Sequence, residues 1–173
     1  EKNQEKEVKQ ETASQQTSIT CEPGVVYAPI RGQVVPMEEI PDPTFASGVL
    51  GVGCGIVPEE GEVVAPFDGA LSSGAATAHA VGIESPDGIE LLIHVGIDTV
   101  SLDGKGFRLL CAQGDQVKAG QPILRFDLDV IRKAKLSTVT AIMVTNADDY
   151  DNVSLIHTGP VQPLDQMLKV NKK

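Results

Sequence analysis

Short runs of β-branched and aliphatic residues, separated by glycine and proline, make up most of this chain from Cys21 onward. Helical periodicity is weak, and 17 glycines and 11 prolines punctuate the runs. Short strands with turn residues between them are typical of β-sandwiches and β-barrels. One short helix is expected at 127–135, with Asp127 as its N-cap. We therefore predict an all-β, antiparallel fold with strands at 25–29, 32–35, 55–57, 62–65, 70–71, 78–84, 89–95, 121–126 and 138–144.

Composition limits both the core and the partners of this chain. Its 173 residues suffice for one domain with a sizeable core. Aromatic residues make up only 3% of the sequence, so the core has to be built from valine, isoleucine, leucine and alanine. The formal net charge of −10 argues against nucleic acid or an anionic membrane as partner and favours a basic protein. No apolar run approaches the roughly 18 residues of a membrane span, so we expect no direct membrane insertion.

The chain divides into three regions of different composition. Residues 1–20 are rich in Glu, Lys, Gln, Ser and Thr, and we expect a disordered polar leader or interdomain linker there. Residues 21–168 form the predicted domain, and 169–173 a polar tail. The three cysteines are odd in number and lack metal-ligand spacing, so reduced thiols in a cytoplasmic protein are the simplest interpretation.

An internal repeat and a turn unit add to this pattern. The motif A-P-x-x-G occurs at 28–32 and again at 65–69, each time after a valine-rich run. Two copies indicate a repeated strand-corner unit and not a solenoid. A tight strand-turn-strand is expected at 114–124, with glycine at both corners.

Two of the three histidines lie on either side of a short turn. If Pro86 and Asp87 alone form the loop, His79 lies directly opposite His94 on the neighbouring strand. Directly opposed residues have Cβ atoms about 4.5–5.5 Å apart, so both imidazoles could reach one small anion or metal ion. A plain type I turn splays the strands, however, and the commoner loop includes Gly88 as a third residue. That register would send the two rings to opposite faces of the sheet.

The side-chain pattern favours the first of these registers. It pairs Val81 with Leu92 on the face of the histidines and leaves Ala80 and Ile93 for the core. We therefore expect the histidines to converge on the first face.

The sequence resembles the glucose-type IIA domain of the bacterial phosphoenolpyruvate-dependent sugar phosphotransferase system. The resemblance runs from about Val25 to Val161. Its most specific block is 90–107 (ELLIHVGIDTVSLDGKGF), which is similar to the family signature around the phosphorylated histidine. Supporting blocks lie at 28–32, 64–69, 77–80, 114–120 and 137–140.

This resemblance implies an antiparallel β-sandwich, or barrel-sandwich, of the duplicated hybrid-motif type. It implies phosphoryl transfer from the phosphocarrier protein HPr to His94, and onward to the cysteine of a sugar-specific IIB domain. It assigns the phosphate to His94 and an assisting role to His79. It also implies a cytoplasmic domain, either free-standing or tethered to a membrane permease.

Chemistry adds roles for the neighbours of the two histidines. A histidine accepts a phosphoryl group only through an unprotonated nitrogen, so His94 should be neutral in a defined tautomer, and we expect the Gly96 carbonyl to fix it. Thr77 should orient His79, which would stabilise charge on the phosphoryl group. The resemblance adds acidic residues that would attract HPr, and the nearby sequence adds apolar ones that would exclude water. The predicted partner-binding residues are Asp42, Phe45, Val49, Leu50, Val81, Leu92 and Asp98.

Other functions stay open at this point. Paired histidines bind zinc, but catalytic zinc usually takes three protein ligands and no third ligand has obvious spacing. A zinc hydrolase is therefore the weaker interpretation. The other metal possibility is an intermolecular zinc bound by His79 and His94 and completed by a partner. Phosphoryl transfer itself is expected to require no cofactor. The turn unit at 114–124 is similar to biotinyl or lipoyl carrier domains, but no lysine lies in the histidine hairpin turn. A regulatory module that binds other enzymes according to its phosphorylation state could coexist with transfer.

Overall fold

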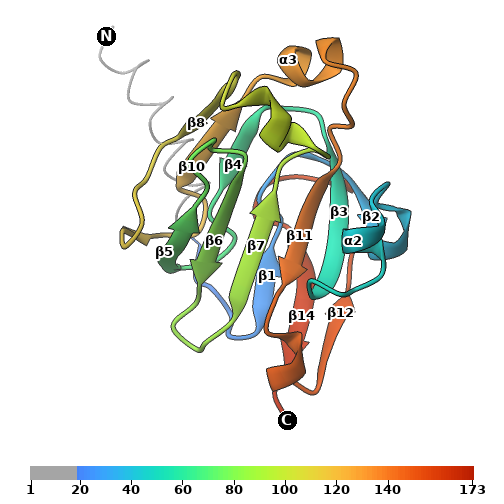
Figure 1. The fold of residues 1–173 in the computed structure, drawn as a ribbon. Coiled ribbons are helices and arrows are strands. Elements are labelled where there is room, and N and C mark those ends of the chain that lie inside the picture. Colours follow the sequence, from blue (N-terminus) through green and yellow to red (C-terminus); the bar gives the residue numbers. More distant parts are fainter. Residues whose placement is uncertain (1–18) are drawn as a thin grey trace, which may run out of the picture.

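A computed structural model describes residues 19–173 of this chain. The predicted leader therefore lies almost entirely outside the described residues. The described part is built mostly of antiparallel β-strands, with a few short helical turns at its edges (Figure 1). The strands are Val25–Tyr27 (β1), Gly32–Pro36 (β2), Val52–Pro58 (β3), Glu62–Val64 (β4), Gly69–Gly74 (β5), Ala80–Glu84 (β6), Glu90–His94 (β7), Phe107–Leu109 (β8), Gln116–Val117 (β9), Pro122–Phe126 (β10), Thr140–Val144 (β11), Asn152–Leu155 (β12), Gly159–Val161 (β13) and Gln166–Asn171 (β14).

The helical segments are short and lie between strands. Their bounds are Met37–Glu39 (η1), Pro43–Ala46 (α2), Thr99–Leu102 (η2), Leu128–Lys133 (α3) and Ala147–Asp149 (η3). The predicted helix is α3, and the Asp127 carboxylate caps it by accepting hydrogen bonds from the backbone N–H groups of Asp129 and Val130. None of the helices in residues 19–173 is long and apolar enough to cross a membrane.

The strands form one large sheet and two small ones, all with antiparallel pairing. The large sheet has the order β13-β2-β3-β11-β7-β6-β5-β9, and the small sheets have the orders β1-β14-β12 and β4-β10-β8. Between them lies a core that is mainly valine, isoleucine and leucine, as the composition predicted. The antiparallel β-sandwich is therefore confirmed.

The fold is internally duplicated, and the two A-P-x-x-G corners are its clearest sign. They contact each other reciprocally: Tyr27 N donates to Pro66 O at 3.0 Å, and Val64 N donates to Pro29 O at 2.8 Å. The strand order of the large sheet repeats the same relation, because β13-β2-β3-β11 on one side mirrors β9-β5-β6-β7 on the other. The predicted repeated strand-corner unit is therefore present.

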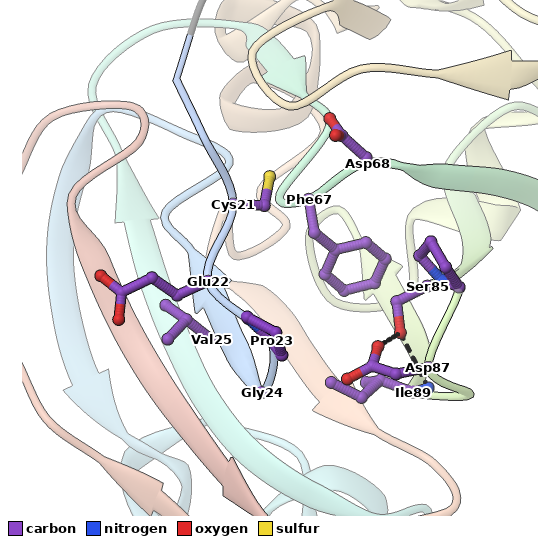
Figure 2. Close-up of a pocket in the computed structure, with 11 residues that line it drawn as sticks. Cys21, Glu22, Pro23, Gly24, Val25, Phe67, Asp68, Ser85, Asp87 and Ile89 are labelled. Carbon is purple, nitrogen blue, oxygen red and sulfur yellow. Dashed lines mark hydrogen bonds between the residues drawn. The ribbon is translucent and has the colours of Figure 1, made fainter.

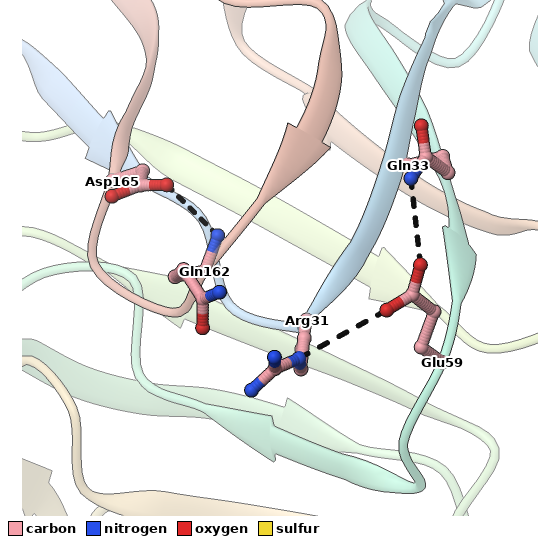
Figure 3. Close-up of polar contacts among 5 residues, drawn as sticks. All are labelled: Arg31, Gln33, Glu59, Gln162 and Asp165. Carbon is pink, nitrogen blue, oxygen red and sulfur yellow. Dashed lines mark hydrogen bonds and ion pairs between the residues drawn. The ribbon is translucent and has the colours of Figure 1, made fainter.

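A second pair of matching turns follows the same duplication. Lys118 N donates to Gln121 Oε1 at 3.1 Å, and Gln162 N donates to Asp165 Oδ2 at 2.8 Å in the equivalent turn (Figure 3). Both turns need a left-handed residue, which is Gly120 in the first and Leu164, with φ 76°, in the second. The repeats have thus kept their backbone while their side chains diverged.

The corner at 28–32 is braced differently from its counterpart at 65–69. Glu59 lies between two side chains of the first corner, 3.9 Å from Arg31 Nε and 3.4 Å from Gln33 Nε2 (Figure 3). In the second corner the residue equivalent to Arg31 is Asp68, whose carboxylate accepts a hydrogen bond from Ala119 N at 2.9 Å. The two copies of this corner are therefore stabilised by different polar contacts.

The favoured register of the histidine hairpin is wrong. Strand β6 pairs with β7 so that Ala80 lies opposite His94 and Val81 opposite Ile93. Gly88, with φ 97°, is the third loop residue, because a glycine in the left-handed region removes the splay of a plain type I turn. The shift by one residue turns Val81 inward, where it is 1% exposed.

The polar tail is shorter than predicted. Strand β14 continues to Asn171, and Lys169 pairs with Val25 on one side and Ser154 on the other. The lysines and asparagine conceal this strand in the sequence, since only Val170 within 169–171 is apolar. Strands β8, β12 and β13 were also not predicted, because each is short and mixed in polarity.

Candidate functional site

The two hairpin histidines converge at one end of the large sheet. Their ring centroids are 4.9 Å apart, with the planes at 80° in an edge-to-face arrangement. His94 is the last residue of β7, whereas His79 immediately precedes β6. His79 lies outside the strand, one residue after Ala78 with its left-handed φ of 61°, so the strict alternation of β6 does not fix the direction of its ring. The rings therefore meet as expected, but by a different path.

A backbone carbonyl fixes the orientation of the His94 ring. Its Nδ1 lies 2.9 Å from Gly96 O. Since a carbonyl oxygen only accepts hydrogen bonds, Nδ1 carries the proton, and the neutral ring has its lone pair on Nε2. This is the carbonyl that the sequence analysis predicted.

Small neighbours leave room around this ring. The residues opposite His94 on the two flanking strands are Ala80 and Ala141. Phe45 of α2 lies against the ring, with a centroid distance of 5.0 Å and an angle of 53° between planes. The His94 ring is thus contacted by Phe45 and has only alanine side chains beside it on the two neighbouring strands.

Thr77 lies next to the second histidine. Its Oγ1 is 2.5 Å from His79 Nδ1. When the hydroxyl donates this hydrogen bond, the neutral His79 ring carries its proton on Nε2 and can donate it to an anion. His79 is 8% exposed and His94 is half-buried.

Burial keeps both imidazoles neutral. It lowers the pKa of His79, and the neighbouring His94 lowers this pKa further. Burial likewise lowers the pKa of His94, although the Gly96 carbonyl and the carboxylates of Asp42 and Asp98 oppose the shift. The site therefore offers unprotonated nitrogen at neutral pH.

The two predicted acidic residues both lie close enough to act on His94, and each also has a local structural role. Asp42 is the N-cap of α2, where its Oδ1 accepts a hydrogen bond from Thr44 N at 2.9 Å. Asp98 adopts a left-handed backbone, with φ 60°, immediately before η2. Their negative charges surround a site whose own side chains are neutral.

The predicted apolar contact residues divide into exposed and buried ones. Val49 is 73% exposed and Leu50 is 38% exposed, so both are accessible to a partner. Phe45 is buried and Leu92 half-buried in a small cluster on the outer face of the large sheet. Val81 lies in the core and cannot contact a partner, because the register differs from the one that we favoured.

One accessible residue was missed by the sequence analysis. Val100, two positions after Asp98, is 56% exposed on η2. Val100 and Leu102 are the two aliphatic residues of the otherwise polar stretch 98–106, and this contrast was the available signal. We call Val49, Leu50 and Val100 the rim, because these exposed apolar side chains lie within five residues of Phe45 or Asp98, which both act on His94.

A separate cavity lies at the opposite end of the histidine hairpin. It has a volume of about 210 Å³ and lies between the segment 21–25 and the turn 85–89, with Phe67 between them (Figure 2). Neither His79 nor His94 lines it. The histidine site is therefore distinct from this cavity.

Metal binding by this chain alone is poorly supported by its side chains. Within residues 19–173 no group of three or more His, Cys, Asp or Glu side chains is arranged to hold a metal ion. The two imidazoles would need a ligand from another molecule.

Comparison with known proteins identifies the family of this chain. Residues 24–150 match the model of the phosphoenolpyruvate-dependent sugar phosphotransferase system, EIIA 1. The chain belongs to this family.

Individual relatives support the same assignment. The chain is 46% identical over 130 residues to the PTS system glucose-specific EIIA component of Staphylococcus epidermidis, covering 75% of this chain and 78% of that protein. It is 47% identical over 154 residues to the PTS system glucoside-specific EIICBA component of Staphylococcus carnosus. This alignment covers 88% of the chain but only 22% of the length of that relative.

A solved structure supports the fold of the EIIA domain. The glucose permease IIA from Mycoplasma capricolum has a TM-score of 0.76 and 33% sequence identity, over 83% of this chain and 93% of that one.

The lowered pKa values of the two histidines make stability depend on pH. Unfolded histidines bind protons with the ordinary pKa of 6.5, whereas the folded ones bind them only at lower pH. Between those values the unfolded state holds more protons, so the free energy of unfolding should fall as the pH drops from 7.5 to 5.5. Urea denaturation at several pH values measures this slope. His79→Gln and His94→Gln should flatten it, and His157→Gln, outside the site, is the matched control. Equal slopes in wild type and both site variants would contradict the neutral pair.

Proposed function

We propose that this protein is a phosphoryl carrier of a sugar phosphotransferase system. It accepts the phosphoryl group from phosphorylated HPr on Nε2 of His94 and passes it to the cysteine of a sugar-specific IIB domain. The observation that carries this proposal is the hydrogen bond from His94 Nδ1 to Gly96 O, because it leaves Nε2 free and unprotonated beside a second histidine.

The acceptance step needs little covalent chemistry from other residues. The lone pair of His94 Nε2 attacks phosphorus, a P–N bond forms, and the bond between phosphorus and the donor breaks with its electrons returning to HPr. The Nδ1 proton stays on the ring, bound to Gly96 O. Positioning and charge stabilisation supply most of the catalysis in such transfers.

His79 stabilises the group in transit. Because Thr77 donates to Nδ1, the Nε2–H group of His79 is free to donate a hydrogen bond to a phosphoryl oxygen. The centroid of the His79 ring lies 4.9 Å from that of His94. This hydrogen bond strengthens as charge develops on the phosphoryl oxygens. His79 is thus needed more for transfer than for holding the phosphate.

The rim provides the docking surface for protein partners. Val49, Leu50 and Val100 exclude water from the phosphohistidine, which slows its hydrolysis. Asp42 and Asp98 attract a basic partner, in accord with the net charge of −10. The same surface serves HPr and the IIB domain in turn.

The identity of the phosphorylated residue is tested by incubation with phosphorylated HPr. Wild type should gain one acid-labile phosphate, His94→Gln none, and His79→Gln should accept phosphate but pass it to a IIB domain about 100-fold more slowly, as expected for loss of a transition-state donor. Intact-protein mass spectrometry at alkaline pH follows acceptance, and loss of the phosphate to IIB follows transfer. No phosphate on wild type would contradict the function. Normal onward transfer by His79→Gln would contradict the assisting role.

The docking role of the rim is tested by a charge on its most exposed residue. Val49→Lys should weaken HPr binding by at least about fivefold, since an ammonium group buried at the interface and facing a basic partner costs more than 1 kcal/mol. Ile156→Lys, at 48% exposure beyond β12, is the matched control and should bind normally. Titration calorimetry measures both. Equal affinities for the two variants would place the interface elsewhere.

Zinc binding at an interface remains a prediction for this site. Two neutral imidazoles supply half of a tetrahedral site, so a partner carboxylate would have to complete the coordination.

A regulatory partner that recognises only one phosphorylation state would approach over the same rim.

A further inference from the structure

A fully buried threonine lies behind the phosphoryl acceptor. Thr99 is 0% exposed, and its hydroxyl donates a hydrogen bond to the carbonyl of Val95, the residue after His94. Its methyl group occupies the space beside Gly96, where a Cβ added at position 96 would lie only 2.4 Å from Thr99 Cγ2. Gly96, with φ 75°, and Thr99 therefore fit each other closely.

The next peptide group is fixed from another part of the chain. The N–H of Ile97 donates to Ser137 O at 3.0 Å, while the carbonyl of the same peptide, Gly96 O, accepts from His94 Nδ1. Ser137 is held in turn, because its Oγ accepts a hydrogen bond from Val139 N at 3.2 Å. A peptide that donates at one end accepts more strongly at the other.

The Val95–Gly96 and Gly96–Ile97 peptides are thus each held by a hydrogen bond from or to a residue other than His94. Thr99 holds the Val95–Gly96 peptide, and Ser137 holds the Gly96–Ile97 peptide. The same segment also reaches the second histidine, since Val95 N donates to His79 O at 2.8 Å. The direction of the Gly96 carbonyl depends on these contacts.

We propose that Thr99 is a positioning residue for the phosphoryl acceptor, acting through the Val95 and Gly96 peptides to fix the tautomer and direction of the His94 ring, with Ser137 as its partner on the other side. This inference deepens the proposed function and rests on it for its consequence in transfer. Its structural content, the state of the His94 ring, does not need a phosphoryl donor.

The decisive variants differ by one functional group. Thr99→Val keeps the shape and removes the hydroxyl, whereas Thr99→Ser keeps the hydroxyl. Thr140→Val is the matched control, because Thr140 is also 0% exposed and its hydroxyl also donates to a backbone carbonyl, that of Thr138, at 3.1 Å. Ser137→Ala keeps the carbonyl that accepts from Ile97 N and removes the hydroxyl that accepts from Val139 N, so it tests whether holding the Ser137 backbone in place matters.

Two readouts are measured on the four variants and wild type. Nitrogen-15 NMR of the His94 side chain gives the ratio of its two neutral tautomers. Loss of the Thr99 hydroxyl should shift this ratio about 3- to 10-fold toward the Nε2–H form and slow phosphoryl acceptance from HPr by a similar factor, the usual worth of one hydrogen bond. Ser137→Ala should shift both readouts in the same direction, while Thr99→Ser and Thr140→Val should stay within twofold of wild type.

The outcomes separate this inference from the proposed function. An unchanged tautomer ratio in Thr99→Val would overturn the positioning role. An equal change in Thr140→Val would also overturn it, because the effect would then reflect a general loss of stability. A wild type that accepts no phosphate from HPr would overturn the proposed function, and the tautomer ratio would still decide the role of Thr99.

Discussion

The hydrogen bond between His94 Nδ1 and the Gly96 carbonyl is the contact on which the whole site depends. It determines which nitrogen of the ring is free, and the burial that lowers the His94 pKa keeps that nitrogen unprotonated. A left-handed glycine two residues after the histidine makes the contact possible, since the chain must turn back sharply enough to present its carbonyl. The second histidine and the carboxylates of Asp42 and Asp98 all act on the ring that carries this nitrogen.

The duplicated sheet pairs the strand of the acceptor histidine on both sides. Strands β7 and β11 are the central pair of the eight-stranded sheet, at the junction between its two matching halves. His94 ends β7 there, with an alanine on each flanking strand. Paired on both sides, the backbone of this histidine has less freedom than a loop residue would have. The duplication gives two similar halves, and His79 and His94 both belong to the half with the β6–β7 hairpin.

The sequence predicted the kind of fold, the family resemblance and the anchoring carbonyl, because each depends on local residue patterns. It failed where a single backbone angle decides the outcome. Gly88 in the left-handed region changed the hairpin register and moved Val81 into the core, while the irregular backbone at Ala78 and His79, just before β6, leaves the His79 ring beside that of His94. No pattern of side chains predicts a left-handed alanine. Strand β14 was concealed for a different reason, since long-range pairing with β1 and β12 overrides the polar character of its end.

The position of the phosphate on the His94 ring tests the central claim most directly. The protein is incubated with phosphorylated HPr, and phosphorus-31 and nitrogen-15 NMR at alkaline pH then identify the nitrogen that carries any phosphoryl group. Because Nδ1 is bound to the Gly96 carbonyl, the account predicts phosphate on Nε2 alone. Phosphate on Nδ1 would mean that this hydrogen bond does not select the acceptor, and it would contradict the account.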